Sequence, residues 1–273
     1  MNKLKKTKNL YAFLWEKSGG GEFKNSWHFN KVQEVIPETI IRGRSGIEIG
    51  SGCGYDTYLM AKNNPSVRIV SLDISDGVFK SKELTSRLRN VWIIKASALN
   101  IPVRDNTFDF AYSFGVLHHL SDPAQGLREI ARIIKKDTPA YLYLYEDHSE
   151  NRIKYLAIKV VSLVRYFTTK IPPKTLYLIS FLLSPAVVFF FSYPAKVLKK
   201  FKMTQSLSQR FPFNFGTHPF SLSGDLYDRL GAPIEHRFNK EQIYSMLINC
   251  GFNKINITKL KDSAGWVTWG FKK

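Results

Sequence analysis

The sequence of 273 residues predicts an α/β fold built on a doubly wound, mostly parallel sheet. Between residues 45 and 146, short apolar runs of strand type alternate with longer runs of helical type. The first apolar run ends in a turn with glycines at alternate positions, residues 50–54, and a helical pattern follows directly. Near the end of the chain, residues 253–260 and 265–272 form two more strand-like runs. Five alternating strands and a closing hairpin give a seven-stranded sheet.

Each element can be placed along the chain from its own pattern. The lysine-rich residues 1–22 are expected to form a flexible basic arm. The expected strands lie near residues 45–50, 67–73, 91–96, 108–114 and 140–146. The expected helices lie near residues 26–36, 55–63, 76–88, 123–135 and 240–250. Strands that alternate with helices in this way require a parallel sheet with right-handed crossovers.

The glycine turn is the strongest local indication of a ligand site. Glycine reaches positive φ values and has no Cβ, so a ligand can lie directly on the backbone there. The spacing is G-x-G-x-G, and Tyr55 stands where a dinucleotide fingerprint would have its third glycine. The second expected strand ends in Asp73, 19 residues after Gly54, where a carboxylate can accept hydrogen bonds from a ribose diol. The pattern therefore predicts a nucleotide-type ligand at this edge of the sheet.

Further motifs follow this turn in order. Residues 101–110 (IPVRDNTFDF) and 113–120 (SFGVLHHL) surround the fourth expected strand, and a helical run follows. On these motifs the chain resembles the class I S-adenosylmethionine-dependent methyltransferases, and most of all their ubiquinone/menaquinone-type branch. The similarity covers residues 45–145, and residues 238–271 fit the last helix and the closing hairpin of the family. The resemblance implies a Rossmann-like methyltransferase fold, S-adenosyl-L-methionine as cofactor and transfer of its methyl group.

The resemblance also implies a set of cofactor-binding residues. The set consists of Glu48, Gly50, Ser51, Gly52, Gly54, Asp73, Ile74, Ser97, Ala98 and Phe114. Glu48 and the glycine turn are expected at the methionine part of the cofactor, and Asp73 at its ribose. Ser97 stands where the family usually carries an aspartate that contacts the adenine amino group. A serine hydroxyl can accept the same hydrogen bond, but without a negative charge.

Candidate catalytic residues follow the fourth expected strand. His118 and His119 lie beside the position expected for the reactive sulfur. One of them contacts cofactor or substrate, or acts as a base for a hydroxyl acceptor; the alternative is a loop histidine bonded to the backbone. Methyl transfer from a sulfonium needs little acid–base machinery, because the donor is already activated. No metal site is expected, because adjacent histidines point apart and no cluster of cysteines or carboxylates accompanies them.

Three other groups carry weaker indications. Residues 146–148 (Glu-Asp-His) end the fifth strand and either orient a substrate hydroxyl or form a solvated strand end. Residues 235–237 (Glu-His-Arg) lie where the chain returns to the sheet and could line an acceptor pocket. Trp15, Trp27 and His28 either cap the cofactor, whose sulfonium an aromatic face would attract, or pack as ordinary helix side chains.

The formal net charge of +18 is concentrated in one part of the chain. Eleven Lys or Arg residues lie between residues 151 and 210, and no acidic residue occurs between Glu150 and Asp225. The same segment is apolar and helical in pattern, which predicts a helical insertion after the fifth strand. The expected parts of the chain are residues 1–149 (arm and cofactor-binding part), 150–222 (insertion) and 223–273 (last helix and hairpin).

One stretch of the insertion, residues 175–195, carries no charge and is long enough to span a bilayer. Pro185 and Pro194 are expected to break or kink a helix there. A single span would also place the two halves of one sheet on opposite sides of the membrane. We therefore expect a helical lid and not a transmembrane helix.

This lid has three interpretations. It is a soluble cap, an interfacial lid that contacts an anionic membrane and admits a lipid-like acceptor, or a nucleic-acid surface, against which the long apolar runs argue. The expected function is S-adenosylmethionine-dependent methylation of a small-molecule or lipid-linked acceptor. The alternatives are an RNA methyltransferase and a non-catalytic cofactor-binding module. Two cysteines, Cys53 and Cys250, exclude a disulfide framework and favour a cytoplasmic protein, peripheral on the membrane if the lid is interfacial.

Overall fold

The computed structural model describes residues 3–18, 34, 43–259 and 265–273. The chain divides into two compact units. The α/β unit contains Leu14–Glu146 and Ile234–Lys273, and the helical unit contains Met1–Phe13 and Asp147–Pro233. The helix expected over residues 26–36 lies outside the described residues, apart from Glu34.

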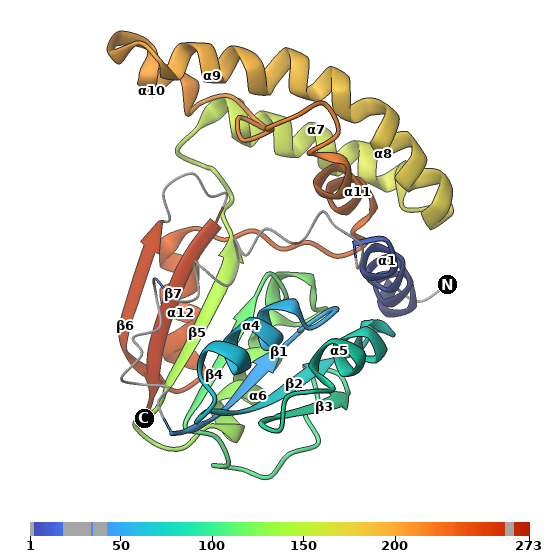
Figure 1. Cartoon of the computed structure of the whole chain (residues 1–273). Helices are drawn as coiled ribbons and strands as arrows, with labels where there is room; N and C mark the ends of the chain where they lie inside the picture. The colour runs from blue at the N-terminus through green and yellow to red at the C-terminus, as the bar shows by residue number, and fades with distance from the viewer. Residues whose placement is uncertain (1–2, 19–33, 35–42, 260–264) are drawn as a thin grey trace. The chain divides into compact units, whose positions relative to one another are not determined.

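The α/β unit is built on a seven-stranded sheet with the strand order β3-β2-β1-β4-β5-β7-β6 (Figure 1). The strands are β1 Ser45–Ile49, β2 Arg68–Asp73, β3 Val91–Lys95, β4 Phe110–Phe114, β5 Pro139–Tyr145, β6 Phe252–Lys259 and β7 Gly265–Lys272. Strands β1 to β5 pair in parallel, while β7 pairs antiparallel with both β5 and β6. The expected doubly wound, mostly parallel sheet with a closing hairpin is confirmed.

Helices cover both faces of this sheet. They are α4 Tyr55–Asn63, α5 Gly77–Thr85, α6 Pro123–Ile133 and α12 Lys240–Asn249. On one face, Ile47 of β1 lies in a buried core with Leu127 of α6 and Leu247 of α12. On the other face, Phe110 of β4 lies in a second core with Met60 of α4. Successive residues of a strand point to opposite faces, so a parallel sheet with two apolar faces needs helices on both sides.

Short-range signals in the sequence set the ends of these helices. Asp122 caps α6, because its Oδ1 accepts a hydrogen bond of 2.9 Å from the Gln125 amide. Asn239 and Gln242 form a capping box at the start of α12, with two reciprocal bonds of 2.9 and 3.0 Å. Gly251 follows α12 with a φ of 89°, the left-handed conformation that commonly ends a helix.

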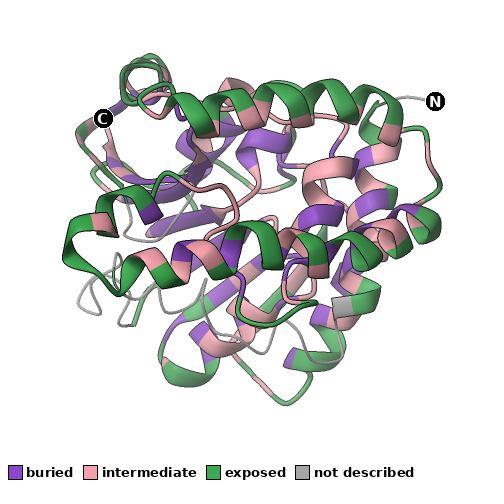
Figure 2. Cartoon of the chain, turned by 90° about the horizontal axis from the view of Figure 1, so that it is seen from above, coloured by how far each residue is buried: buried purple, intermediate pink, exposed green. Residues whose placement is uncertain are grey.

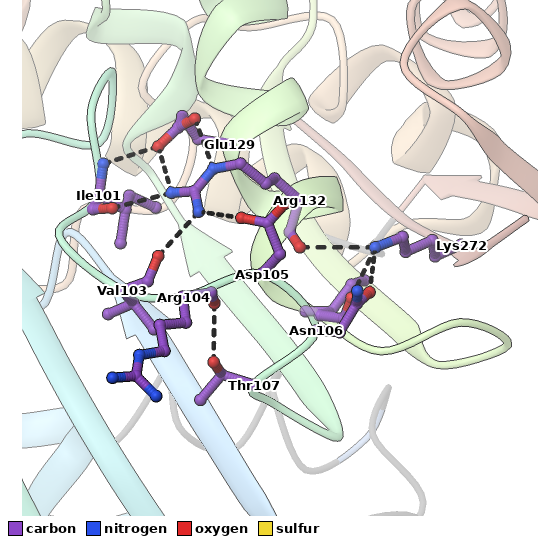
Figure 3. A network of polar contacts seen from close by, with 10 residues as sticks. Ile101, Val103, Arg104, Asp105, Asn106, Thr107, Glu129, Arg132 and Lys272 are labelled. Atoms are coloured by element: carbon purple, nitrogen blue, oxygen red, sulfur yellow. Dashed lines mark hydrogen bonds and ion pairs between the residues drawn. The ribbon is translucent and has the colours of Figure 1, made fainter.

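A polar network fixes the connection that leads into β4 (Figure 3). The guanidinium of Arg132 on α6 donates to Glu129 at 2.9 Å and to Asp105 at 2.7 Å. It also donates to the backbone oxygens of Ile101 at 2.8 Å and Val103 at 2.7 Å. The hydrogen bonds from Arg132 hold the pKa of Glu129 below its usual value. The Arg132 side chain therefore connects the loop before β4 to the helix α6 after it by hydrogen bonds.

The helical unit is arranged around α11. Its helices are α7 Arg152–Thr168, α8 Pro173–Val187, a π-helical turn Val188–Ser192, α9 Tyr193–Lys199, α10 Gln205–Ser208 and α11 Ser223–Gly231, together with the first part of α1 Lys3–Ser18. Both α7 and α8 pack against α11. The structure thus groups α11 with the insertion, although it follows residue 222.

The prediction of a flexible N-terminal arm is wrong for residues 3–18, because these residues form the helix α1. Long-range contacts stabilise this helix within the helical unit. Tyr11 donates to the Asp228 carboxylate at 2.6 Å, and Tyr227 donates to the Leu10 carbonyl at 3.2 Å. Both partners lie 217 residues away along the chain, so no local pattern around α1 contains them.

Of the break or kink expected at Pro185 and Pro194, the break is wrong, because helical structure continues from Pro173 to Lys199. Pro194 lies in the first turn of α9, where proline is tolerated. Pro185 lies inside α8 and removes one amide donor, and the π-helical turn follows three residues later. The chain therefore adjusts the pitch of the helix and does not end it.

Candidate functional site

The order of the strands reverses between β1 and β4. β1 has β2 on its other side, and β4 has β5. Ligands of open parallel sheets bind at the carboxyl ends of the strands, at such a switch point. Both strands are followed there by a glycine with positive φ, 81° for Gly50 and 79° for Gly115. A Cβ on Gly115 would meet no atom of the described residues within 4 Å.

The glycine turn after β1 cannot accept side chains at its alternate positions. Gly52 and Gly54 also have positive φ values, 56° and 77°. A Cβ on Gly50 would lie 2.1 Å from Val116, and one on Gly54 would lie 2.0 Å from the Ser81 hydroxyl. Both the conformation and the packing therefore require glycine at these positions.

Asp73, at the end of β2, is held rigidly beside this turn. One carboxylate oxygen accepts from the Gly52 amide at 2.9 Å, and the other accepts from the Ser75 amide at 2.7 Å. A carboxylate offers about four acceptor positions, so both oxygens can accept further hydrogen bonds. In the same turn, the buried Ser51 hydroxyl has no hydrogen-bond partner among the described residues. These groups fit a polar ligand with a diol, as expected for the ribose, and the half-buried Ile74 follows next.

Glu48 lies beneath the turn and not on its surface. Its Oε2 accepts hydrogen bonds from the Thr57 hydroxyl and, at 3.0 Å, from the Tyr112 hydroxyl. Burial raises the pKa of Glu48 to about 8, and the nearby charge of Asp56 adds to this shift. Every hydrogen bond that we observe from Glu48 is internal, which makes it a support of the turn. Its contact with the methionine part of the cofactor stays a prediction.

The remaining expected cofactor residues follow β3 or end β4. The Ser97 hydroxyl accepts from the Leu99 amide at 3.2 Å, so it also stabilises its own turn. Ala98 is buried in the core beside it. Phe114 is half-buried, and its ring lies parallel to that of Tyr143 with 6.5 Å between centroids. The contacts of Ser97, Ala98 and Phe114 with adenine stay predictions.

Trp15 lies against the glycine turn. A Cβ on Gly52 would be 2.6 Å from its indole ring, and Lys80 donates to the Trp15 carbonyl at 3.3 Å. Trp15 was expected either to cap the cofactor or to pack as an ordinary helix side chain. Its position against the glycine turn is compatible with a cap, and this role stays a prediction. The other aromatic candidates, Trp27 and His28, lie outside the described residues.

The two histidines after β4 have different environments. The His118 ring is completely buried and lies on Tyr145, with 3.7 Å between ring centroids. Neither of its nitrogens has a hydrogen-bond partner among the described residues. Burial, followed by the charges of His119 and Arg237, lowers the pKa of His118 well below its usual value. His118 is therefore neutral at physiological pH. His119 is the backbone-bonded one, since its Nδ1 lies 2.8 Å from the Ile234 carbonyl.

The returning segment, residues 234–238, fixes the histidine loop in place. The His236 amide donates to the His118 carbonyl at 2.7 Å, and the His236 Nε2 lies 3.1 Å from the Leu120 carbonyl. The Phe238 amide donates to the Tyr145 carbonyl at 2.9 Å. In the sequence, the position of residues 235–237 at the end of the insertion was the only signal that they belong here.

Charged side chains lie beside the histidine loop and the returning segment, and together they form one wall of the candidate site. Arg237 donates to Glu235 at 2.7 Å and to the Glu146 carbonyl at 3.0 Å, and Lys259 pairs with Glu146 at 2.5 Å. The Arg237 guanidinium lies 5.1 Å from the Tyr145 ring centre. Of the group expected at residues 146–148, only Glu146 belongs to the α/β unit. Within the described ranges, no group of three or more His, Cys, Asp or Glu residues is arranged to hold a metal ion.

Comparisons with known proteins agree with this geometry. Residues 47–142 match the model of a family described as "Methyltransferase domain". The chain is 40% identical over 94 residues to the demethylmenaquinone methyltransferase of Corynebacterium kroppenstedtii, which is 34% of this chain and 38% of that protein. It is 34% identical over 94 residues to the tRNA (carboxymethyluridine(34)-5-O)-methyltransferase of Saccharomyces cerevisiae, again 34% of this chain and 32% of the relative.

In both cases the match spans only about a third of the relative. Among solved structures, the complex between the Haloferax volcanii Trm112 methyltransferase activator and the putative methyltransferase matches with a TM-score of 0.57 and 13% identity. This match covers 97% of each chain and shows the fold. These comparisons support a class I S-adenosylmethionine-dependent methyltransferase domain in the α/β unit, and S-adenosyl-L-methionine is the cofactor that such a domain implies.

Proposed function

We propose that this protein transfers the methyl group of S-adenosyl-L-methionine to a small-molecule or lipid-linked acceptor. The observation that carries this proposal is the rigid pairing of Asp73 with the glycine turn at the switch point of the sheet. The cofactor, when bound, supplies a methyl group already activated by its sulfonium. The residues of the chain have to bind it, align it with an acceptor and exclude water.

Each part of the site has a distinct task in this proposal. The amides of the glycine turn and the Ser51 hydroxyl hold the methionine part, and Asp73 holds the ribose hydroxyls. His118, neutral and without a hydrogen-bond partner among the described residues, is the residue that contacts the acceptor or the cofactor through one of its ring nitrogens. His119, bonded to the backbone, keeps the loop in position.

The nature of the acceptor is supported by two observations. One similar protein is named as a demethylmenaquinone methyltransferase, which fits a quinone-like or other lipid-linked acceptor. The basic and apolar insertion fits an acceptor that is used at an anionic membrane surface. A cytoplasmic location, peripheral on the membrane, is part of this proposal, and the two free cysteines and the composition of the insertion support it.

Titration calorimetry with S-adenosyl-L-methionine tests the cofactor site. Asp73→Ala should weaken binding by about a hundredfold or more, because two ribose hydroxyls lose a charged acceptor. Asp76→Ala is the matched control, because Asp76 lies three residues further on and its exposed side chain pairs with Lys95. The control should bind like the wild type. Equal affinities for all three proteins would show that Asp73 is not the ribose ligand.

An RNA acceptor is the second candidate, favoured by the tRNA methyltransferase among the relatives and by the eleven basic residues of the insertion. It predicts tRNA binding that falls steeply with salt, because bound phosphates release counterions. Filter binding with tRNA at increasing salt separates the candidates. A cofactor-binding module without catalysis would bind S-adenosyl-L-methionine but would transfer no labelled methyl group to lipid or RNA extracts.

A further inference from the structure

The outer face of α7 is apolar over its whole length. Large apolar side chains recur there at every third or fourth position, and all are more than half exposed. They are Ile153, Leu156, Val160, Leu163 and Phe167. No residue of α7 is buried. In a water-soluble protein this spacing marks the face that packs on the core, and here it faces outward.

The long helical stretch Pro173–Lys199 has the same reversed arrangement. Its buried face recurs every three or four residues and consists largely of small side chains: Leu176, Ser180, Ser184, Val188, Ser192 and Ala195. The serine hydroxyls donate to backbone carbonyls, for example Ser184 to Pro219 at 2.9 Å. The outward side chains include Leu178, Leu182, Phe189, Phe190 and Val197. Exposed residues predominate along the long helices (Figure 2).

By length and composition, this stretch is the one helix among the described residues that could cross a membrane. Only 28% of its most apolar window is buried, whereas the core helix of a soluble protein would be mostly buried. A crossing conflicts with the topology, because β5 before the insertion and β7 after it are hydrogen-bonded neighbours in one sheet. An apolar outer face that does not cross can lie in the plane of the membrane interface.

The charges of the insertion identify the kind of surface that it fits. Eight Lys and Arg residues of the insertion are exposed: Arg152, Lys159, Lys170, Lys174, Lys199, Lys200, Lys202 and Arg210. The segment between Glu150 and Asp225 holds no acid to neutralise them. Lys159 lies 5.2 Å from the Tyr155 ring centre, and Lys196 lies 5.5 Å from that of Tyr193. Cations beside exposed aromatic rings suit the headgroup layer of an anionic bilayer.

We propose that the helical unit docks on an anionic lipid bilayer without spanning it. The outward faces of α7 and of Pro173–Lys199 enter the boundary between headgroups and acyl chains, and the exposed lysines contact the lipid phosphates. A second copy of the chain fits less well, since it would bring the same positive charges together. RNA fits less well, since it would leave the apolar stripes in water. The delivery of a lipid-linked acceptor by this docking rests on the proposed function, but docking itself requires neither cofactor nor acceptor.

Co-sedimentation with vesicles tests the docking surface. The probes are vesicles of phosphatidylcholine with and without phosphatidylglycerol. The wild type should bind the phosphatidylglycerol vesicles, and added salt should weaken binding. Phe190→Glu and Leu163→Glu should each reduce the partition coefficient at least about tenfold, because an apolar side chain is lost from the bilayer. Lys159→Gln should reduce it about fivefold on the anionic vesicles and leave binding to phosphatidylcholine unchanged.

Two control variants make this test specific. Phe79→Glu in α5 makes the same change as Phe190→Glu at a nearly equal exposure, 63% against 65%, but lies in the α/β unit. It should bind vesicles like the wild type. Asp73→Ala should also bind normally, which separates docking from the proposed cofactor site. Wild-type protein that stays in the supernatant would overturn docking. So would a dimer in sedimentation that Phe190→Glu dissociates, or salt-dependent tRNA binding without vesicle binding.

Discussion

The two units of this protein use opposite arrangements of apolar and polar side chains. In the α/β unit, Ile47, Leu127 and Leu247 point inward and form a buried core. In the long helix of the helical unit, Ser180 and Ser184 point inward, while Leu182 and Phe190 are exposed. One physical rule accounts for both, because apolar side chains turn toward whichever surroundings lack water. The exposed apolar side chains of the long helix are the arrangement that the proposed docking on a bilayer requires.

The charges of the two units differ in the same way. Some charges of the α/β unit are paired within the unit, as Arg132 is with Glu129 and Asp105. The insertion has no acidic residue between Glu150 and Asp225, so its eleven basic residues have no acid within the segment. A concentrated surplus of one sign suits a partner of the opposite sign.

The largest expected effect on stability comes from a substitution on the buried face of α8. It tests whether the small side chains of this face, and not its apolar outer side chains, pack against protein. Ser184→Leu should lower the free energy of unfolding by about 3 kcal/mol, because it overfills a buried position and removes the bond to the Pro219 carbonyl. Leu182→Gln, on the outer face two residues earlier, should change it by no more than about 0.5 kcal/mol without lipid. Urea unfolding followed by circular dichroism measures both. A large decrease in the free energy of unfolding for Leu182→Gln would show that protein covers Leu182. It would contradict the outward orientation of the apolar face of α8.

The sequence predicted the α/β unit well because its signals are local. The strand pattern and the glycine turn at residues 50–54 each act within a few residues. The helix α1 was not predicted, because its partners Tyr227 and Asp228 lie 217 residues away. The continuity of α8 through Pro185 was missed for a related reason. It depends on packing against α11, and composition alone does not show this.

The candidate site also contains residues that local patterns predict and residues that only the fold brings together. The glycine turn and Asp73 follow strands directly, so their positions could be predicted from the pattern of the strands. The wall around His118 could not, because the chain first leaves the sheet for the insertion and then returns with His236 and Arg237. Neither residue shares a local pattern with His118, and only the fold brings them together.

A smaller effect should come from the polar network of α6. Arg132→Ala should lower the free energy of unfolding by about 2 kcal/mol, because two carboxylates and two carbonyls lose a partly buried charged donor. Arg128→Ala is the matched control on the same helix, since its side chain is half exposed and its ion pair with Asp122 is long, at 3.4 Å. The control should cost at most about 0.5 kcal/mol. Equal costs would mean that the network does not stabilise the α/β unit.

A pH-dependent effect on stability concerns Glu48. Its pKa is about 8 in the folded protein, against a usual value of 4.5, so the folded state holds a proton that the unfolded state has lost across this window. Stability should therefore fall as pH rises from about 4.5 to about 8, by at most about 1.4 kcal/mol per pH unit, and the dependence should end above that range. Glu48→Gln keeps an acceptor for Thr57 and Tyr112 but cannot ionise, so it should flatten this part of the profile. Urea unfolding at several pH values measures both proteins. Parallel profiles for variant and wild type would place the titrating group elsewhere and leave Glu48 ionised beneath the turn.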